Sequence, residues 1–367
     1  MIGYGILTEI LKRWGCTVEE HFVTTDDGYE ILVIQASINI TQATPIVMAH
    51  GILVNSLSFV GKYNKTTAYN LMEQGYQIFF LNFRGTRYSK KSRQFSDSDR
   101  QFWYFSFHEM GIYDLRSTLK LVFFLTKQKA IIISYSMGTT ATLVYTSSYP
   151  FEAQNRLLGV ILLAPVSTFV NSLSLLIMGA PIWPMIRPFF ENLWNGSLFP
   201  RNEEFNRFCS SGPGPIFICE TLKIPLLGED YAQMDPLYLP VTNELYVDRT
   251  GISVFDHYVQ IIMTGQFRQF DYGTVKNIRV YGQIIPPSYQ LSNIKVPIAL
   301  FVGKNDLLAS PGDATVLSVR LGSSLCGLTF ISYPIWNHID FLTAKDMNLY
   351  LNTPVLAKVA QMEQGLC

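Results

Sequence analysis

Residues 130–140 read AIIISYSMGTT, and this stretch decides the fold that we expect. Its apolar, mostly β-branched start is typical of a buried strand, and the segment 139–149 has the spacing of a helix. Ser136 lies at the corner between them, with the small residues Ser134 and Gly138 two positions away on either side. A tight strand-to-helix turn of this kind presents one serine hydroxyl above the sheet. We therefore predict that Ser136 is a nucleophile rather than a loop serine without a chemical role.

The segments around this corner alternate between strand-like and helix-like patterns. Strand-like segments lie at 29–38, 44–51, 76–85, 130–136 and 157–165, and helix-like segments at 115–126 and 139–149. This alternation predicts an α/β fold with a mostly parallel sheet that is covered on both faces.

The strand rhythm stops near residue 167 and returns at 296–306 and 328–338. Because the chain returns to strand-type segments, one insertion explains the gap more simply than a second independent domain. We therefore predict a core formed by 1–166 and 291–367, with an inserted cap at 167–290.

A nucleophilic serine needs a histidine as base, and in this architecture the base comes last along the chain. Only His257 and His338 follow Ser136. His257 falls in the irregular insertion, whereas His338 follows the last predicted strand. We therefore predict that His338 is the base and not an ordinary surface residue.

The base in turn needs an acid that orients it. Asp306 ends the strand segment before the one that leads to His338. Strand ends converge at the carboxyl edge of a parallel sheet. The competitors are Asp313, which lies deeper in the loop, and Asp340, which is too close to His338 in sequence to approach its ring from behind. We therefore predict Asp306 as the acid, although it could also cap a helix.

Two backbone N–H groups should bind the oxyanion that forms during acyl transfer. One should come from Met137, directly after the nucleophile, and the other from Ile52, in the loop after the strand 44–49. Gly51 lets that backbone approach closely. His50 precedes the nucleophile, so we expect it to shape the loop rather than to act as a base.

Composition excludes several classes of protein. The formal net charge is +0 and no basic run occurs, so nucleic-acid binding has no electrostatic support. The five cysteines are scattered without a C-x-x-C pair, so we expect no zinc site, and their odd number leaves at least one thiol unpaired in a monomer. We expect no metal and no cofactor.

The N-terminal segment, MIGYGILTEILKRWG, lacks the features of a signal peptide. Three N-glycosylation sequons occur, at Asn39, Asn64 and Asn195. The apolar stretch 157–186 is interrupted by prolines and polar residues, so a buried strand followed by a helix fits it better than a transmembrane span.

Several longer stretches resemble a known family, the acid lipases, which comprise the gastric and lysosomal lipases and their insect relatives. The most specific are NFRGTRYSKKSRQF (82–95), FWYFSFHEMGIYDLRSTL (102–119), GQFRQFDYGT (265–274) and WNHIDF (336–341). The resemblance covers nearly the whole chain.

This resemblance implies an α/β-hydrolase core and a helical cap with a movable lid, which we place near 198–228. It also implies hydrolysis of triacylglycerols or cholesteryl esters at a lipid–water interface or membrane surface, by a secreted or lysosomal protein that we expect to be monomeric. It assigns nucleophile, acid and base to Ser136, Asp306 and His338, and the oxyanion donors to Ile52 and Met137.

The sequence departs from the family in two places. The elbow of the family reads Gly-His-Ser-Gln-Gly, whereas residues 134–138 read Ser-Tyr-Ser-Met-Gly. Cys209 and Cys219 stand at family cysteine positions, but the usual partner upstream of Cys209 is missing, so we do not predict the bridge of the family and leave the disulfide pairing open. The altered elbow leaves two alternatives to a lipase, namely a short-chain carboxylesterase and a lipid-binding relative with little or no activity.

Overall fold

The computed structural model describes residues 5–41, 44–200, 202–235 and 238–367. One large sheet has the strand order β1-β2-β4-β3-β6-β7-β10-β11, and a short β5 pairs with β2. The strands are β1 (Thr17–Thr24), β2 (Tyr29–Ser37), β3 (Pro45–Ala49), β4 (Gln77–Leu81), β5 (Lys91–Ser92), β6 (Ala130–Tyr135), β7 (Leu157–Leu163), β10 (Ile298–Val302) and β11 (Leu325–Phe330). The pairs β1–β2 and β2–β4 are antiparallel, and all later neighbours in this order are parallel. The predicted α/β fold with a mostly parallel sheet is confirmed.

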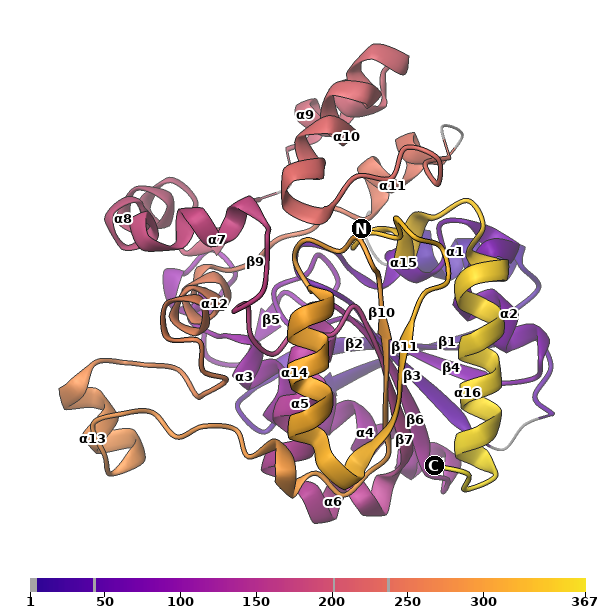
Figure 1. Ribbon diagram of the computed structural model, residues 1–367, viewed down its shortest axis with the longest axis horizontal. Coiled ribbons are helices and arrows are strands. Elements are labelled where there is room, and N and C mark those ends of the chain that lie inside the picture. Colours follow the sequence, from indigo (N-terminus) through magenta and orange to yellow (C-terminus); the bar gives the residue numbers. More distant parts are fainter. Residues whose placement is uncertain (1–4, 42–43, 201, 236–237) are drawn as a thin grey trace.

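Helices flank the sheet (Figure 1). They are α1 (Gly5–Arg13), α2 (Thr67–Glu73), α3 (Phe107–Glu109), α4 (Arg116–Thr126), α5 (Met137–Ser148), α6 (Pro150–Arg156), α14 (Pro311–Leu321), α15 (Asp340–Thr343) and α16 (Thr353–Glu363). Short 3-10 turns lie at 56–59, 63–65, 100–103, 180–182, 291–293 and 322–324, and π-helical turns at 110–115 and 348–352. The predicted helices 115–126 and 139–149 correspond to α4 and α5.

The central strands form the core of the molecule. Every residue of β3, β6 and β10 is buried. Because α4 and α5 pack on β6, and α14 packs on β10 and β11, these strands are continuous apolar runs rather than alternating ones. The strand β1 escaped the sequence analysis because it lies at the edge of the sheet and carries mostly exposed or half-exposed residues.

One predicted strand boundary was wrong. The segment 328–338 was expected to be a strand, whereas β11 begins at Leu325 and ends at Phe330. The residues after Phe330 form the loop that leads to His338, and Pro334 within this loop has no N–H to donate to a sheet ladder. The shorter strand leaves a loop of nine residues, 331–339, before α15, and His338 is the eighth residue of this loop.

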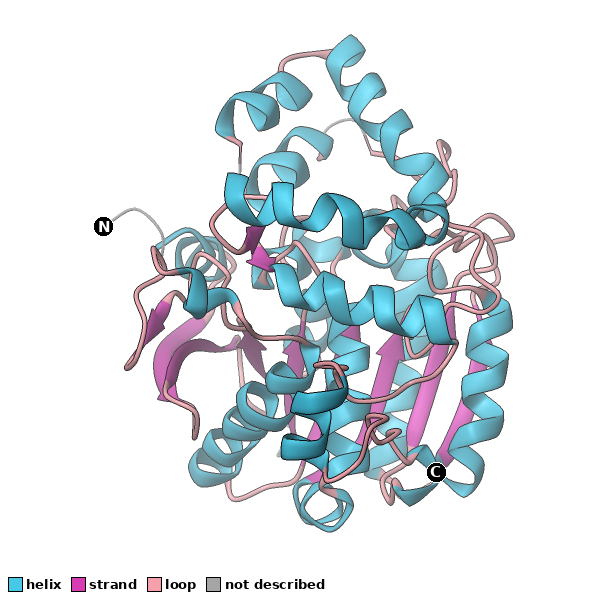
Figure 2. Ribbon diagram, turned by 90° about the vertical axis from the view of Figure 1, so that its left-hand side faces the viewer, coloured by secondary structure: helices cyan, strands magenta, loops and turns pink. Residues whose placement is uncertain are grey.

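The described residues between 167 and 290 are helices and loops, apart from a two-residue strand pair, β8 (Ser197–Leu198) with β9 (Thr250–Gly251). The helices are α7 (Leu175–Gly179), α8 (Trp183–Leu193), α9 (Glu203–Ser210), α10 (Pro213–Leu227), α11 (Leu239–Leu245), α12 (Ile252–Thr264) and α13 (Thr274–Tyr281). Figure 2 shows many of these helices above the ends of the parallel strands.

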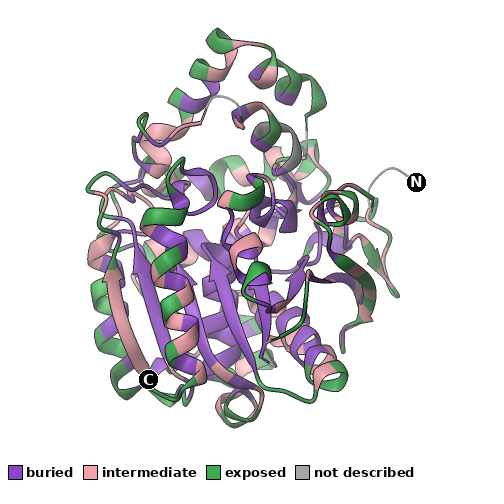
Figure 3. Ribbon diagram, turned by 90° about the vertical axis from the view of Figure 1, so that its right-hand side faces the viewer, coloured by how far each residue is buried: buried purple, intermediate pink, exposed green. Residues whose placement is uncertain are grey.

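This inserted region has a small apolar cluster of its own. Its buried members are Ala180, Trp183, Leu198, Ile252 and Val259. Figure 3 shows that α9 and α10 carry many exposed residues, in contrast to the buried central strands. The boundaries that we predicted for the cap, at 167 and 290, stay a prediction.

Two disulfides connect Cys209 with Cys219 and Cys326 with Cys367, and the buried Cys16 is free. The sequence analysis had not predicted the bridge between Cys209 and Cys219. The turn at Ser211–Gly212 folds α10 back along α9, and this brings the Cα atoms of Cys209 and Cys219 to 5.7 Å, within bridging range.

Across the parts of the chain that the structure describes, no helix has both the length and the apolar character needed to cross a membrane. The apolar stretch 157–186 consists of β7, a loop, α7 and the start of α8.

Candidate active site

Ser136 occupies the corner between β6 and α5. Its backbone angles are φ 51° and ψ −119°, a region that residues with a side chain rarely adopt. The Ser136 N–H donates to the carbonyl of Leu163 on β7 at 3.0 Å, and the Thr139 N–H donates to the Ser136 carbonyl at 2.8 Å. The strained conformation is thus held by the neighbouring strand on one side and by the first turn of α5 on the other.

The residues two positions from Ser136 differ in how tightly they are packed. A Cβ atom at Gly138 would lie 2.4 Å from the carbonyl oxygen of Ala49 and 2.8 Å from that of His50, so only glycine fits between α5 and the end of β3. Ser134 is fully buried, and among the described residues its Oγ has no hydrogen-bond partner. Ser134 therefore meets the requirement for a small residue at the cost of one unpaired hydroxyl.

The structure brings Ser136, His338 and Asp306 into one hydrogen-bonded row. The distance from Ser136 Oγ to His338 Nε2 is 2.9 Å, and that from His338 Nδ1 to Asp306 Oδ2 is 2.8 Å. Because a carboxylate accepts hydrogen bonds, Nδ1 carries the proton and Nε2 is left to accept from the serine hydroxyl. All three side chains are buried, so water does not compete for these bonds.

The carboxyl group of Asp306 is fixed from both sides. While Oδ2 faces His338, Oδ1 accepts the backbone N–H groups of Leu308 at 2.9 Å and Ala309 at 2.7 Å. This local turn orients the carboxylate, so the turn-forming role and the proposed catalytic role are compatible in one residue.

The competing residues lie in other hydrogen-bond networks. Asp313 accepts the Ser310 hydroxyl at the start of α14. Asp340 accepts the Asn337 N–H at 2.7 Å, and burial raises its pKa well above the usual value. His257 is enclosed in the insertion, where its Nε2 lies 2.9 Å from the Arg268 carbonyl, and burial lowers its pKa to about 3.

The loop after β3 lies directly against the elbow. A Cβ at Gly51 would lie 3.1 Å from Ser136 Cβ and 2.9 Å from Tyr135 Cε1. His50 Nδ1 lies 2.8 Å from the Gly51 carbonyl, and its Nε2 accepts the Phe83 N–H at 3.1 Å. Burial lowers the pKa of His50 to about 4, so the ring is neutral at neutral pH and shapes the loop.

This close approach places the segments of the two expected oxyanion donors next to each other. Ile52 follows Gly51 in the chain, and Met137 follows Ser136 as the first residue of α5. The first N–H groups of a helix have no partner within it. The two donors therefore belong to segments that touch at the nucleophile.

Tyr135 has a role that the sequence analysis missed. Its hydroxyl donates to the backbone carbonyl of His338 at 3.1 Å, and the two ring centres are 5.2 Å apart. The side chain is buried, and burial raises its pKa well above the usual value. The only signal in the sequence was that an aromatic residue with a polar tip stands next to the nucleophile.

Asp248 is a second residue that was not predicted. Its N–H donates to the carbonyl of Leu53, which has a positive φ of 58°. Its carboxylate accepts the Asn55 side-chain amide at 2.8 Å and the Arg87 Nε at 3.2 Å. Asp248 thus connects the inserted region to the loop that carries Ile52.

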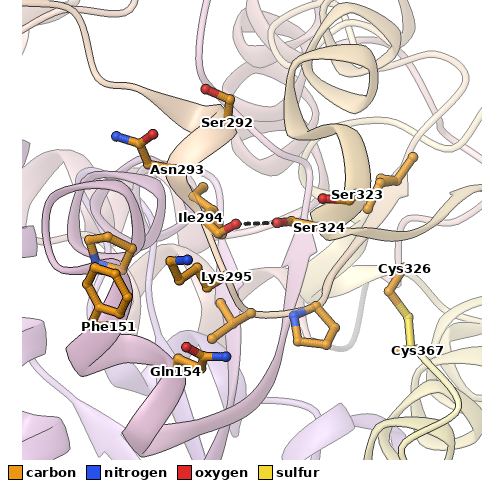
Figure 4. A pocket seen from close by; sticks show the side chains of 14 residues that line it. Phe151, Gln154, Ser292, Asn293, Ile294, Lys295, Ser323, Ser324, Cys326 and Cys367 are labelled. Carbon is orange, nitrogen blue, oxygen red and sulfur yellow. Dashed lines mark hydrogen bonds between the residues drawn. A yellow bond between two sulfur atoms is a disulfide. The ribbon is translucent and has the colours of Figure 1, made fainter.

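A cavity of about 720 Å³ lies away from Ser136. It is lined by residues that precede β10 and β11, by Phe151 and by the bridge between Cys326 and Cys367 (Figure 4). Because these residues stand at the amino ends of the parallel strands, the cavity is at the opposite end of the sheet from the elbow.

The side chains of the three sequons, Asn39, Asn64 and Asn195, are exposed, and their glycosylation stays a prediction. In the described ranges, no group of three or more His, Cys, Asp or Glu side chains is arranged to hold a metal ion.

Comparison with known proteins agrees with this geometry. Residues 44–202 match the family described as alpha/beta hydrolase fold, and residues 7–63 match the partial alpha/beta-hydrolase lipase region. Among solved structures, a thermophilic esterase from Thermogutta terrifontis is similar with a TM-score of 0.55 and 14% identity, over 94% of this chain and 99% of that chain. The chain therefore has the α/β-hydrolase fold.

Proteins that are similar in sequence along most of this chain are lipases. Lipase 1 of Drosophila melanogaster is 28% identical over 360 residues, which are 97% of this chain and 80% of that protein. Human gastric triacylglycerol lipase is 27% identical over 368 residues, which are 97% of this chain and 91% of that protein. The chain is therefore similar to the gastric-type lipases over most of its length, and the predicted resemblance to the acid lipases is confirmed.

Proposed function

We propose that this protein is a serine ester hydrolase that cleaves carboxylic esters of neutral lipids, triacylglycerols or cholesteryl esters. The observation that carries the proposal is the row of hydrogen bonds from Ser136 through His338 to Asp306 at a strained strand-to-helix corner. The names of the relatives, which are lipases, supply the class of substrate.

In the first half of the reaction, Ser136 Oγ attacks the ester carbonyl carbon while His338 Nε2 takes the hydroxyl proton. The carbonyl oxygen becomes an oxyanion, which the N–H groups of Ile52 and Met137 bind. Asp306 stabilises the imidazolium that forms. The bond to the alcohol then breaks, the alcohol leaves with the proton from Nε2, and an acyl-serine remains.

In the second half, a water molecule gives one proton to His338 Nε2 and attacks the acyl carbon. The second tetrahedral intermediate collapses, the fatty acid leaves, and the proton returns to Ser136 Oγ. The cycle consumes one water for each ester and needs neither a metal nor a cofactor.

The insertion exposes apolar side chains of the kind that bind a lipid phase. Large apolar side chains on α7, α8 and α10 are exposed, among them Leu175, Met178, Met185, Phe189, Leu193, Phe217, Ile218 and Leu222. Exposed apolar surface of this extent marks a site of interaction. We infer that 167–290 is a cap that meets the lipid–water interface, with a movable lid near 198–228.

The two disulfides also suit a secreted or lysosomal location, because disulfides persist in oxidising compartments.

The test of the proposed function is hydrolysis of acyl esters of increasing chain length, with Ser136→Ala as the control. Turnover of long-chain esters by the wild type alone supports a lipase. Turnover limited to short, soluble esters would make it a carboxylesterase, and no turnover at any length would make it a non-catalytic lipid-binding relative.

A further inference from the structure

Three consecutive backbone carbonyls at the end of helix α10 contact the loops of the proposed acid and base. The Leu227 oxygen accepts the His338 N–H at 3.1 Å. The Gly228 oxygen accepts Asn337 Nδ2 at 3.0 Å, and the Glu229 oxygen accepts Asn305 Nδ2 at 2.7 Å. Asn337 precedes the base in the chain and Asn305 precedes the acid. The end of one helix therefore accepts hydrogen bonds from both loops.

Gly228 makes this approach possible. Its φ of +100° lies in the region that favours glycine, and a Cβ there would lie 2.1 Å from the Asn305 carbonyl oxygen and 3.0 Å from Asn337 Cβ. The backbone of Gly228 therefore lies directly against both loops, within reach of the Asn337 side-chain amide.

Asn337 is the centre of this contact, and both its side-chain oxygen and its side-chain nitrogen form hydrogen bonds. The side chain is buried, and its Oδ1 accepts the N–H groups of Ile339 at 2.9 Å and Asp340 at 3.0 Å. Its amide nitrogen reaches the other way, to Gly228. The residue therefore both holds the turn that leads into α15 and attaches the loop of the base to α10.

The backbone of His338 is held on both sides. Its N–H donates to Leu227 and its carbonyl accepts the Tyr135 hydroxyl. In addition, the Asn305 N–H donates to the Trp336 carbonyl at 3.0 Å, which ties the loop of the acid to the loop of the base. The support of the base thus comes from the elbow, from the acid loop and from α10.

We propose that Asn337 and Asn305 are positioning residues that fix the His338–Asp306 pair against the end of α10, so that the placement of this helix sets the alignment of the base. The inference rests on the proposed function, because it concerns the same Ser136–His338–Asp306 row.

The experiment compares Asn337→Ser, Asn305→Ala and a control. Serine keeps an oxygen that can accept from the start of α15 but does not reach Gly228, so Asn337→Ser tests the attachment to α10. The control is Asn352→Ser, because Asn352 is equally buried and also donates to a backbone carbonyl, that of Lys65, outside the site. The less buried Asn305→Ala guards against misfolding of the first variant.

Two readouts are used for each variant, namely kcat and KM on a soluble short-chain ester, and the downfield proton resonance of His338 Nδ1–H. We expect Asn337→Ser to lower kcat at least about ten-fold with KM within about two-fold, because small misplacements of a base are costly. Asn305→Ala should have a smaller effect in the same direction. Both should shift or broaden the proton resonance, whereas Asn352→Ser should lower the melting temperature and leave both readouts unchanged.

The inference is wrong if both asparagine variants keep the wild-type kcat and proton resonance. It is also wrong if the control loses as much kcat as they do, since the effect would then be general destabilisation. A wild type that turns over no ester would reject the proposed function alone, and the proton resonance would still decide whether Asn337 and Asn305 position the pair.

Discussion

Replacing Tyr135 by phenylalanine removes the hydroxyl that joins the elbow to the backbone of the base, His338. The ring is preserved, so the change leaves no cavity in the core. It removes a 3.1 Å hydrogen bond between neutral groups and leaves the buried His338 carbonyl without that donor. An unpaired buried acceptor costs about 1–3 kcal/mol, and we take about 1.4 kcal/mol as the working value.

If this whole cost falls on the orientation of the base in the transition state, kcat drops about ten-fold, because 1.4 kcal/mol corresponds to a factor of ten. KM for a soluble ester should stay unchanged, since the hydroxyl faces the protein backbone. The assay is initial-rate kinetics beside urea unfolding, with Tyr145→Phe as the control. Tyr145 is a buried tyrosine of α5 whose hydroxyl contacts Glu152 rather than the site.

The control should lose stability with unchanged kcat. If Tyr135→Phe loses stability to the same degree and keeps full kcat, the contact holds the fold but does not align the base, and the reasoning is refuted.

Three further predictions concern the oxyanion loop, the elbow and acid stability. Asp248→Asn should lower kcat several-fold by loosening the loop of Ile52, and a variant with wild-type kcat would show that Asp248 only supports the fold. Met137→Gln should raise kcat, because a glutamine can hydrogen-bond its neighbours and hold the oxyanion loop where methionine cannot; a drop would show that Met137 is adapted to its packing. Burial lowers the pKa of His50 to about 4 and that of His257 to about 3, against 6.5 in the unfolded chain. The unfolded chain therefore binds more protons below pH 6.5, so each histidine removes about 2 kcal/mol of stability by pH 5. Urea unfolding of His257→Gln at pH 7 and pH 5 should show a pH effect smaller by about that amount, and an equal pH effect in both proteins would contradict the assignment.

Local patterns made much of the fold predictable. The β-branched run before Ser136 and the order of serine, acid and histidine both follow from short segments at strand ends. The long insertion then brings distant residues together. Asp248 meets Leu53 and Asn55, and Leu227 meets His338, across separations of more than 100 residues. Such pairings leave no periodic trace, so a single sequence cannot reveal them.

The cap disulfide and the end of β11 were missed for different physical reasons. The Cys209–Cys219 bridge depends on how α10 folds back on α9, and that turn is visible only in three dimensions. The segment after Phe330 is apolar and aromatic like a strand, but β11 ends there, and Tyr333 and Trp336 pack against the ring of Tyr350 instead of extending the sheet. Composition alone does not distinguish an apolar segment that forms a strand from one that forms a packed loop.

The bridge between Cys209 and Cys219 has a consequence for limited proteolysis. It closes the tip where α9 turns into α10, and this exposed turn contains Ser211 and Gly212. A protease that nicks the turn would leave two fragments joined by the sulfur atoms, so the cut would be invisible on a gel run without reductant. Only with reductant would the polypeptide fall into two bands, and the nicked protein would then also lose the covalent tie between the helices.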